Sequence, residues 1–177
     1  MRCCSSTTSH YWEVKLMDYV HEIDSLIQEV SLAIGKPISR DTYEIVDRGL
    51  PHIPPTRLPA GKMAIYMFLL GDEFLKIGKA NYRSNARFCS QHYGLNAPST
   101  LAKSLLSDGA MSSLNITSSN IKNWIKTNCR RIDIIIDADL GIFAGTVKSC
   151  SQLRTPVALS CCLGVEWFER FLAQIRP

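Results

Sequence analysis

The sequence predicts an α+β fold in which a small, mainly antiparallel three-stranded sheet is flanked by helices and preceded by a helical extension. Three observations favour this class. Apolar residues recur at helical spacing near the N-terminus, two β-rich runs flank a turn that begins with glycine, and an isoleucine-rich run follows later. The chain has 177 residues, 46% of them hydrophobic, which is enough to bury one full core.

The first predicted element is an amphipathic helix over residues 12–33. Its apolar residues recur at steps of four and three, as one helical face requires; they are Trp12, Leu16, Tyr19, Ile23, Leu26 and Val30. Gly35 and Pro37 end the helix, because glycine lowers helical preference and proline lacks a backbone donor. The apolar stripe either packs on the helix's own domain or forms the seam of a homodimer.

A proline-rich segment, GLPHIPPTRLPAG at residues 49–61, is predicted to be an extended connection. A shorter helix is predicted before it, over residues 41–47. We therefore divide the chain at this segment. Residues 1–60 form a helical extension with its connection, and residues 61–177 form the second domain.

The second domain is predicted to open with a β-hairpin, because the runs at 65–70 and 74–77 flank a three-residue loop that begins with glycine. The segment RIDIIID, residues 131–137, is predicted to be a central, buried strand. Helical spacing and cap residues predict helices over residues 84–93, 99–107, 120–127 and 165–175.

Charge is distributed unevenly in a chain of net charge +4. Residues 61–103 hold six Lys or Arg against two Asp or Glu, which is typical of a phosphate-bearing partner or of a solvated basic face. No apolar run approaches the roughly 20 residues that span a bilayer, and the N-terminus has no hydrophobic signal core. We therefore expect a cytoplasmic protein with no membrane partner. Seven cysteines without a CxxC spacing do not indicate a zinc site or a disulfide framework.

Three residues around the hairpin have side chains suited to chemistry on a phosphate. Tyr66 and Lys76 lie on neighbouring strands, where register can bring them to one face, and Arg87 follows on the next predicted helix. Taken singly, a strand tyrosine, an edge lysine and a helix-surface arginine each have an ordinary structural explanation.

Their joint spacing resembles the core of the GIY-YIG nuclease superfamily. In that pattern a Gly-Ile-Tyr strand pairs with a Tyr-Ile-Gly strand, and an arginine follows. Here the corresponding segments are Ala64-Ile65-Tyr66, then Lys76-Ile77-Gly78, then Arg87. The resemblance extends over residues 62–177, with its best motifs at 64–92. Alanine replaces the first glycine and Lys76 replaces the second tyrosine, as lysine does in some restriction endonucleases of the superfamily.

The resemblance implies a Mg²⁺- or Mn²⁺-dependent endonuclease of the restriction or repair type that hydrolyses phosphodiester bonds in DNA. Tyr66 would take the proton from the attacking water, with its pKa lowered by Lys76, Lys79 and Arg87. Arg87 would also grip the phosphate, for which its planar fork is suited.

A glutamate on the last predicted helix would hold the metal. Glu169 matches by the apolar pair and basic ending that follow it, and Glu166 is the alternative. His92 either positions the tyrosine or the phosphate, or is a histidine at a helix C-terminus. The nucleic-acid groove would include Lys79, Arg83 and Lys103.

Other functions remain open at this point. The missing glycine and tyrosine of the motif also suit a catalytically inactive nucleic-acid-binding module on the same fold, and a ligand-binding domain with accidental similarity is a third reading. The sequence does not separate DNA from RNA. Because cutting both strands of a duplex with one site per chain favours two chains, a homodimer through the N-terminal helix is a natural expectation.

Overall fold

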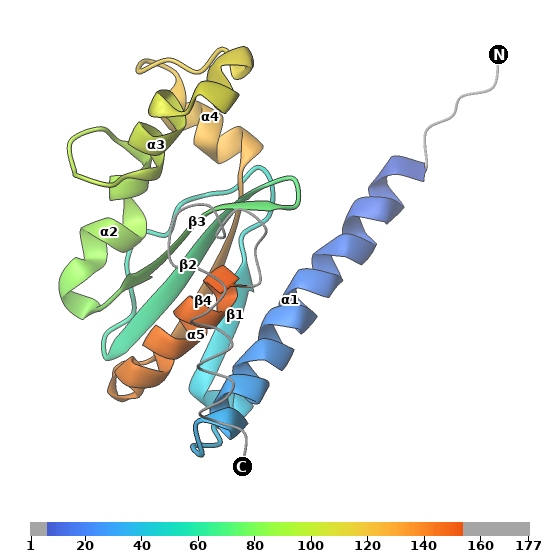
Figure 1. Cartoon of the computed structure of the whole chain (residues 1–177), viewed down its shortest axis with the longest axis vertical. Coiled ribbons are helices and arrows are strands. Elements are labelled where there is room, and N and C mark those ends of the chain that lie inside the picture. The colour runs from blue at the N-terminus through green and yellow to red at the C-terminus, as the bar shows by residue number, and fades with distance from the viewer. Residues whose placement is uncertain (1–6, 154–177) are drawn as a thin grey trace.

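A computed structural model describes residues 7–153 of the chain, with the side chains of residues 19–141 and 143–152. It contains a four-stranded antiparallel sheet in the order β1-β4-β2-β3 (Figure 1). The strands are β1 (Tyr43–Asp47), β2 (Lys62–Leu70), β3 (Glu73–Ala80) and β4 (Arg130–Asp137). The predicted α+β class is confirmed, as are the hairpin and the central position of the isoleucine-rich strand.

The prediction of three strands is wrong, because β1 is a fourth. We expected a helix over residues 41–47, but only a single 3-10 turn forms there, at Arg40–Thr42, before β1 begins. Strand β1 pairs along its whole length with β4, and Ile45 lies opposite Ile134. Pairing with a strand far away in sequence outweighs the local preference in a segment this short.

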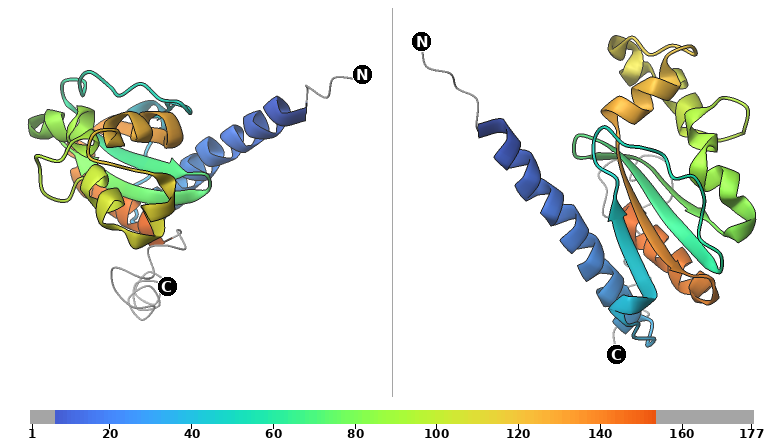
Figure 2. Two further views of the ribbon diagram at one scale, coloured as in Figure 1. Left: turned by 90° about the horizontal axis from the view of Figure 1, so that it is seen from above. Right: turned by 180° about the vertical axis from the view of Figure 1, so that it is seen from behind.

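One face of the sheet is covered by α1 (Thr7–Ala33) and α5 (Gly141–Leu153), as Figures 1 and 2 show. Alternate residues of β2 and β4 form this core with Ile23, Leu26 and Val30 of α1 and with Phe143 and Val147 of α5. The predicted helix over 12–33 is confirmed, and its stripe packs on its own chain at these three α1 positions.

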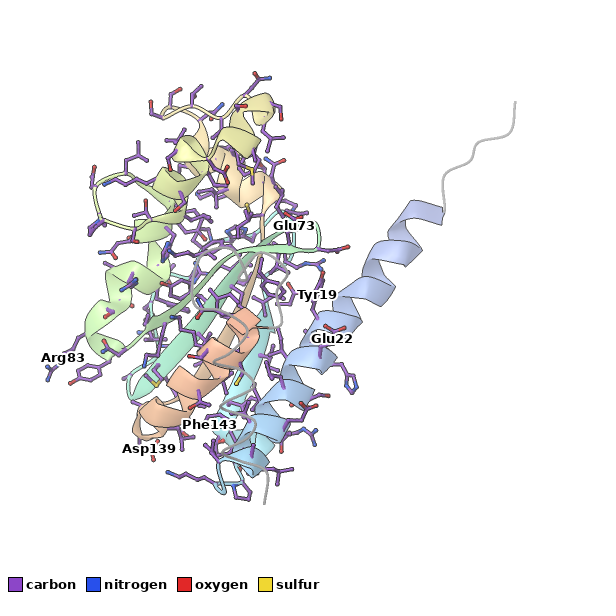
Figure 3. All side chains as sticks on the ribbon, viewed as in Figure 1. Tyr19, Glu22, Glu73, Arg83, Asp139 and Phe143 are labelled. Atoms are coloured by element: carbon purple, nitrogen blue, oxygen red, sulfur yellow. The ribbon has the colours of Figure 1, made fainter. Side chains whose placement is uncertain are left out.

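Tyr19 also belongs to the chain's own packing. Its ring meets Phe74 edge-on at 6.2 Å between centroids, and its hydroxyl donates a hydrogen bond to Asp72 in the hairpin turn (Figure 3). The side chains of Trp12 and Leu16 lie outside the described residues. The homodimer through α1 stays a prediction.

The opposite face is covered by α2 (Asn85–Cys89), α3 (Leu101–Ser107) and α4 (Ile121–Asn128). The helix predicted over 84–93 is shorter than expected. Ser90 leaves helical geometry at φ −135°, and a 3-10 turn, Gln91–Tyr93, follows. This break turns His92 and Tyr93 inward, and both are buried against the sheet.

The helix α5 has no counterpart in the sequence prediction. Two glycines and several β-branched residues lower its helical propensity, but burial of Phe143, Ala144 and Val147 stabilises it on the sheet. The helix predicted over 165–175 lies outside the described residues.

The proline-rich connection contains no regular element and places His52 in the interior. The division of the chain at residue 60 stays a prediction; α1 and β1, on its N-terminal side, share the sheet and core of the residues that follow. Among the described residues, no helix is both long and apolar enough to cross a membrane.

Candidate functional site

Tyr66 lies in the middle of β2, and its ring crosses Gly78 of the neighbouring strand. The two residues are directly paired in the hairpin. A Cβ atom built on residue 78 would lie 2.2 Å from both the ring carbon that bears the hydroxyl and the hydroxyl oxygen. The glycine of the Lys-Ile-Gly motif is therefore required by the tyrosine ring, which carries its hydroxyl across to the edge strand β3.

The Tyr66 hydroxyl is held by two side chains from the covering segment. Arg87 of α2 donates from Nε at 3.2 Å, and Nε2 of His92 lies 2.7 Å away. The backbone N–H of Leu101 donates to Nδ1 of His92 at 3.3 Å, so in the neutral ring Nε2 carries the proton. His92 is therefore a donor to Tyr66, whose own proton is left for a third partner.

The pKa values of these groups follow from burial. Burial, and then the charges of Lys76, Arg87 and Arg131, lower the pKa of His92 to about 4, so the ring is neutral at neutral pH. Burial raises the pKa of Tyr66 by more than Arg87 and Arg131 lower it. We expected nearby cations to lower the pKa of Tyr66, and this prediction is wrong, because burial raises that pKa by more. The side chain is 0% exposed, and the phenol is protonated at rest.

A pocket of about 520 Å³ opens beside this cluster at the outer edge of β3, between that strand and α5; we call it the edge pocket. Arg87 reaches both the edge pocket and Tyr66. Lys76 is paired with Phe68, which places it on the same face as Tyr66. Among the described residues that line the pocket none is acidic and four are cationic: Lys76, Lys79, Arg87 and Lys148.

The other predicted nucleic-acid residues are exposed. Lys103 lies on α3, and Arg83 lies in the 3-10 turn Tyr82–Ser84, with its guanidinium 5.2 Å from the ring centre of Tyr82. Figure 3 shows Arg83 projecting away from the body of the protein. The structure brings Arg87 and His92 to the Tyr66 hydroxyl, and it places Lys76 and Lys79 with Arg87 around the edge pocket.

The described residues hold no cluster of metal-ligating side chains. Within them, no group of three or more His, Cys, Asp or Glu side chains lies close enough to hold a metal ion. The edge pocket offers amines, a guanidinium, a hydroxyl and an amide, whereas Mg²⁺ prefers carboxylate and water oxygens. The predicted ligand Glu169, and Glu166, lie outside the described residues.

A buried arginine that the sequence reasoning missed fixes the segment carrying Arg87 and His92. Arg131 of β4 donates to the Phe88 carbonyl at 2.7 Å and to the Tyr93 hydroxyl at 3.0 Å. Phe88 follows Arg87 and Tyr93 follows His92, so one guanidinium holds the neighbours of both site residues. Its signal in the sequence is the alternation of Arg131 and Asp133 with the isoleucines of β4.

The charge of Arg131 is compensated within the core. Its Nε donates to Asp133 at 2.8 Å, and the other oxygen of Asp133 is bound by Arg48. The guanidinium also packs on the rings of Phe68 and Phe88 at 5.2 and 4.9 Å. This network joins β4, the connection before β2 and the covering helices around the Tyr66 ring.

Comparisons of the chain with family models, with curated proteins and with solved structures found no match. Function is therefore inferred from the contacts of Tyr66, Arg87 and His92, from the charge of the edge pocket, and from the residue pattern that links them.

Proposed function

We propose that the protein is a DNA endonuclease that hydrolyses phosphodiester bonds at Tyr66, Arg87 and His92. The observation that carries the proposal is the Tyr66 hydroxyl, hydrogen-bonded to Arg87 and His92 beside a pocket lined by four cations. Hydrolysis of a phosphodiester needs a base for water and positive charge on the phosphate oxygens. The cluster offers both kinds of group within one small region.

Each residue has a distinct task in this proposal. Arg87 uses Nε to hold Tyr66, and its remaining N–H groups bind phosphate oxygens. Lys76 adds charge on the same face. Neutral His92 keeps Tyr66 oriented by donating from Nε2. Tyr66 takes the proton from water as a phenolate, whose fraction rises about tenfold for each pH unit below its pKa.

The metal remains part of the proposal only through Glu169. A bound Mg²⁺ or Mn²⁺ supplies stabilisation of the leaving 3′ oxygen. No described residue of the edge pocket is assigned to stabilise the leaving oxygen. The roles of Tyr66, Arg87 and His92 do not depend on the metal.

Cleavage of plasmid DNA in Mg²⁺ tests the proposal. We expect Tyr66→Phe, Arg87→Ala and Glu169→Ala each to lower the cleavage rate at least about 10²-fold, because each removes proton transfer or charge stabilisation. Lys122→Gln, an exposed lysine on α4, is the matched control and should cleave like the wild type. Undiminished cleavage by any of the three variants would refute the role of that residue.

The second candidate function is a nucleic-acid-binding module without turnover. It is favoured by the complete burial of Tyr66, whose hydroxyl is bonded to Arg87 and His92, because water reaches the phenol only after a covering side chain moves. The two functions are separated by one panel of duplex, branched and single-stranded DNA and RNA. Binding in EDTA without cleavage of any substrate in Mg²⁺ would establish the second.

A further inference from the structure

The edge pocket has a composition that the proposed chemistry at Tyr66 does not explain. Lys148 lines it from α5, a helix that no sequence pattern singled out, together with Lys76 and Lys79 of β3. We infer that the edge pocket binds a phosphate group directly, without a divalent ion, and that Lys148 is one of its ligands. The inference adds a binding site to the proposed function, and it depends on that function only for which molecule carries the phosphate.

The first support is positive charge that the described side chains leave without an ionic partner. Among the described side chains, none of the pocket's four cations forms an ion pair, whereas Lys62 pairs with Asp137 at 2.6 Å and Arg40 pairs with Asp24 at 2.7 Å. Burial, and then the charges of Arg87 and Lys148, lower the pKa of Lys76. Cations that repel one another around a partly enclosed space are stabilised by an anion.

The second support is the shape of the pocket walls. Gly145 lines the helix side and has no side chain of its own, so a ligand can approach the α5 backbone there, whereas on the strand side Gly78 is covered by the Tyr66 ring. The Nζ atom of Lys79 lies 3.8 Å from the point where a Cβ on Gly145 would be. Cations from β3, α2 and α5 therefore surround a space of about 520 Å³, which is ample for a phosphate group.

The third support is the position of Arg87 at the boundary of the pocket. Its Nε is bound to Tyr66, and the residue also lines the edge pocket. A phosphate held by Lys79 and Lys148 would lie next to the one at Tyr66. Under the proposed function it is the neighbouring phosphate of the same strand, so the substrate is a polynucleotide with a phosphate on each side of the flanking sugar.

Binding is tested on the full chain, labelled with ¹⁵N, in EDTA. Inorganic phosphate, a mononucleotide and a single-stranded oligonucleotide are titrated separately, and the amide signals of Gly78 and Gly145 are followed. Gly94, which lines a different pocket with Lys122 and Lys126, is the internal reference. We expect Gly78 and Gly145 to shift with all three ligands, Gly94 to shift little, and the oligonucleotide to saturate at the lowest concentration.

Variants assign the shifts to the pocket. Lys148→Gln should weaken binding about tenfold, while Lys148→Arg, which keeps the charge, should stay within about threefold of the wild type. Lys122→Gln should leave binding unchanged. Ser149→Asp places a carboxylate in the exposed rim of the pocket and gives a second route to the same loss of binding.

The outcomes separate this inference from the proposed hydrolysis. Equal binding by Lys148→Gln and the wild type, shifts at Gly94 as large as at Gly78, or binding that requires Mg²⁺ would overturn the phosphate site. Shifts with phosphate and mononucleotide alone would keep the site and assign it to a small phosphate ligand. Phosphate binding by a chain that cleaves nothing would also keep the site, while refuting the hydrolase.

Discussion

At the scale of single residues, the contact between Tyr66 and Gly78 leaves no space for a side chain at residue 78. We expect Gly78→Ala to lower the free energy of unfolding by about 1 to 3 kcal/mol, because the new methyl group overlaps the tyrosine ring. Gly145→Ala is the matched control. Its new methyl group meets only the Lys79 amine, at an ordinary 3.8 Å, and should raise stability by about 0.5 to 1 kcal/mol. Urea denaturation measures both, and equal effects would contradict the close approach.

His92 makes stability depend on pH in the acid range. Its pKa of about 4 lies below the roughly 6.5 of an unfolded histidine, so the unfolded chain binds the proton more readily. The stabilisation is complete above pH 6.5 and is lost as the pH falls toward 4. We expect a loss on the order of 3 kcal/mol from this residue.

Urea denaturation from pH 4 to 8 measures that loss, and the His92→Gln variant isolates it. The pKa of His52 is also lowered, by burial, and adds a loss in the same direction. Because His52 is present in both proteins, their difference reports His92 alone. Parallel pH profiles for the wild type and the variant would show that the pKa of His92 is not lowered in the folded protein.

Which site residues can be predicted from the sequence follows from how local their contacts are. Tyr66, Lys76 and Gly78 are paired within one hairpin, so their spacing reveals them. The spacing does not reveal Lys148, because this residue reaches the pocket beside β3 only through the packing of α5, whose sequence has no clear helical periodicity. Arg131 is not revealed either, because a strand rich in isoleucine predicts burial and gives no partner for a buried guanidinium.

At the scale of elements, β4 fixes the position of α2 and of the turn Gln91–Tyr93. We expect Arg131→Met to lower the free energy of unfolding by about 3 to 5 kcal/mol, because Asp133 loses a buried partner. Hydrogen exchange should accelerate more at the amides of α2 and that turn than at those of β2, since the bonds to Phe88 and Tyr93 are lost.

Lys62→Met is the control for that experiment. Its ion pair with Asp137, at the other end of β4, is partly exposed and should contribute less than about 1 kcal/mol. Uniform acceleration of exchange across the sheet in Arg131→Met would indicate general destabilisation and contradict the specific anchoring of α2.

Elements with their own strong periodicity were predictable, and those stabilised by distant contacts were not. The helix α1 and the hairpin carry clear local signals. Strand β1 is five residues long and gains its hydrogen bonds from β4, while α5 is helical because the sheet offers a surface for Phe143 and Val147. The residue pattern of a segment contains no information about the distant surface on which that segment packs.

At the scale of the whole molecule, the predicted division at residue 60 has a direct test. A fragment of residues 61–177 lacks β1 and α1, so β4 becomes an edge strand and Ile132, Ile134 and Ile136 lose the cover of α1. We expect this fragment to aggregate, as shown by gel filtration and light scattering. A monomeric fragment that unfolds cooperatively would establish residues 61–177 as an independent domain.

The fragment 19–177 is the control and also tests the homodimer. It keeps Tyr19, Ile23, Leu26 and Val30, whose side chains pack on the chain's own core, but lacks Trp12 and Leu16. We expect the full chain to be a dimer by light scattering and both this fragment and the variant Leu16→Glu to be folded monomers. A monomeric full chain, free and on DNA, would exclude the seam through α1.

The insertion of β4 between two earlier strands has a consequence for synthesis. The hairpin of β2 and β3 can close as soon as it leaves the ribosome, which places the phenol of Tyr66 over Gly78. Arg131, which clamps Arg87 and His92 into position, is translated much later. A nascent chain therefore carries the tyrosine without its fixed neighbours, and the proposed hydrolysis begins only after β4 has been translated.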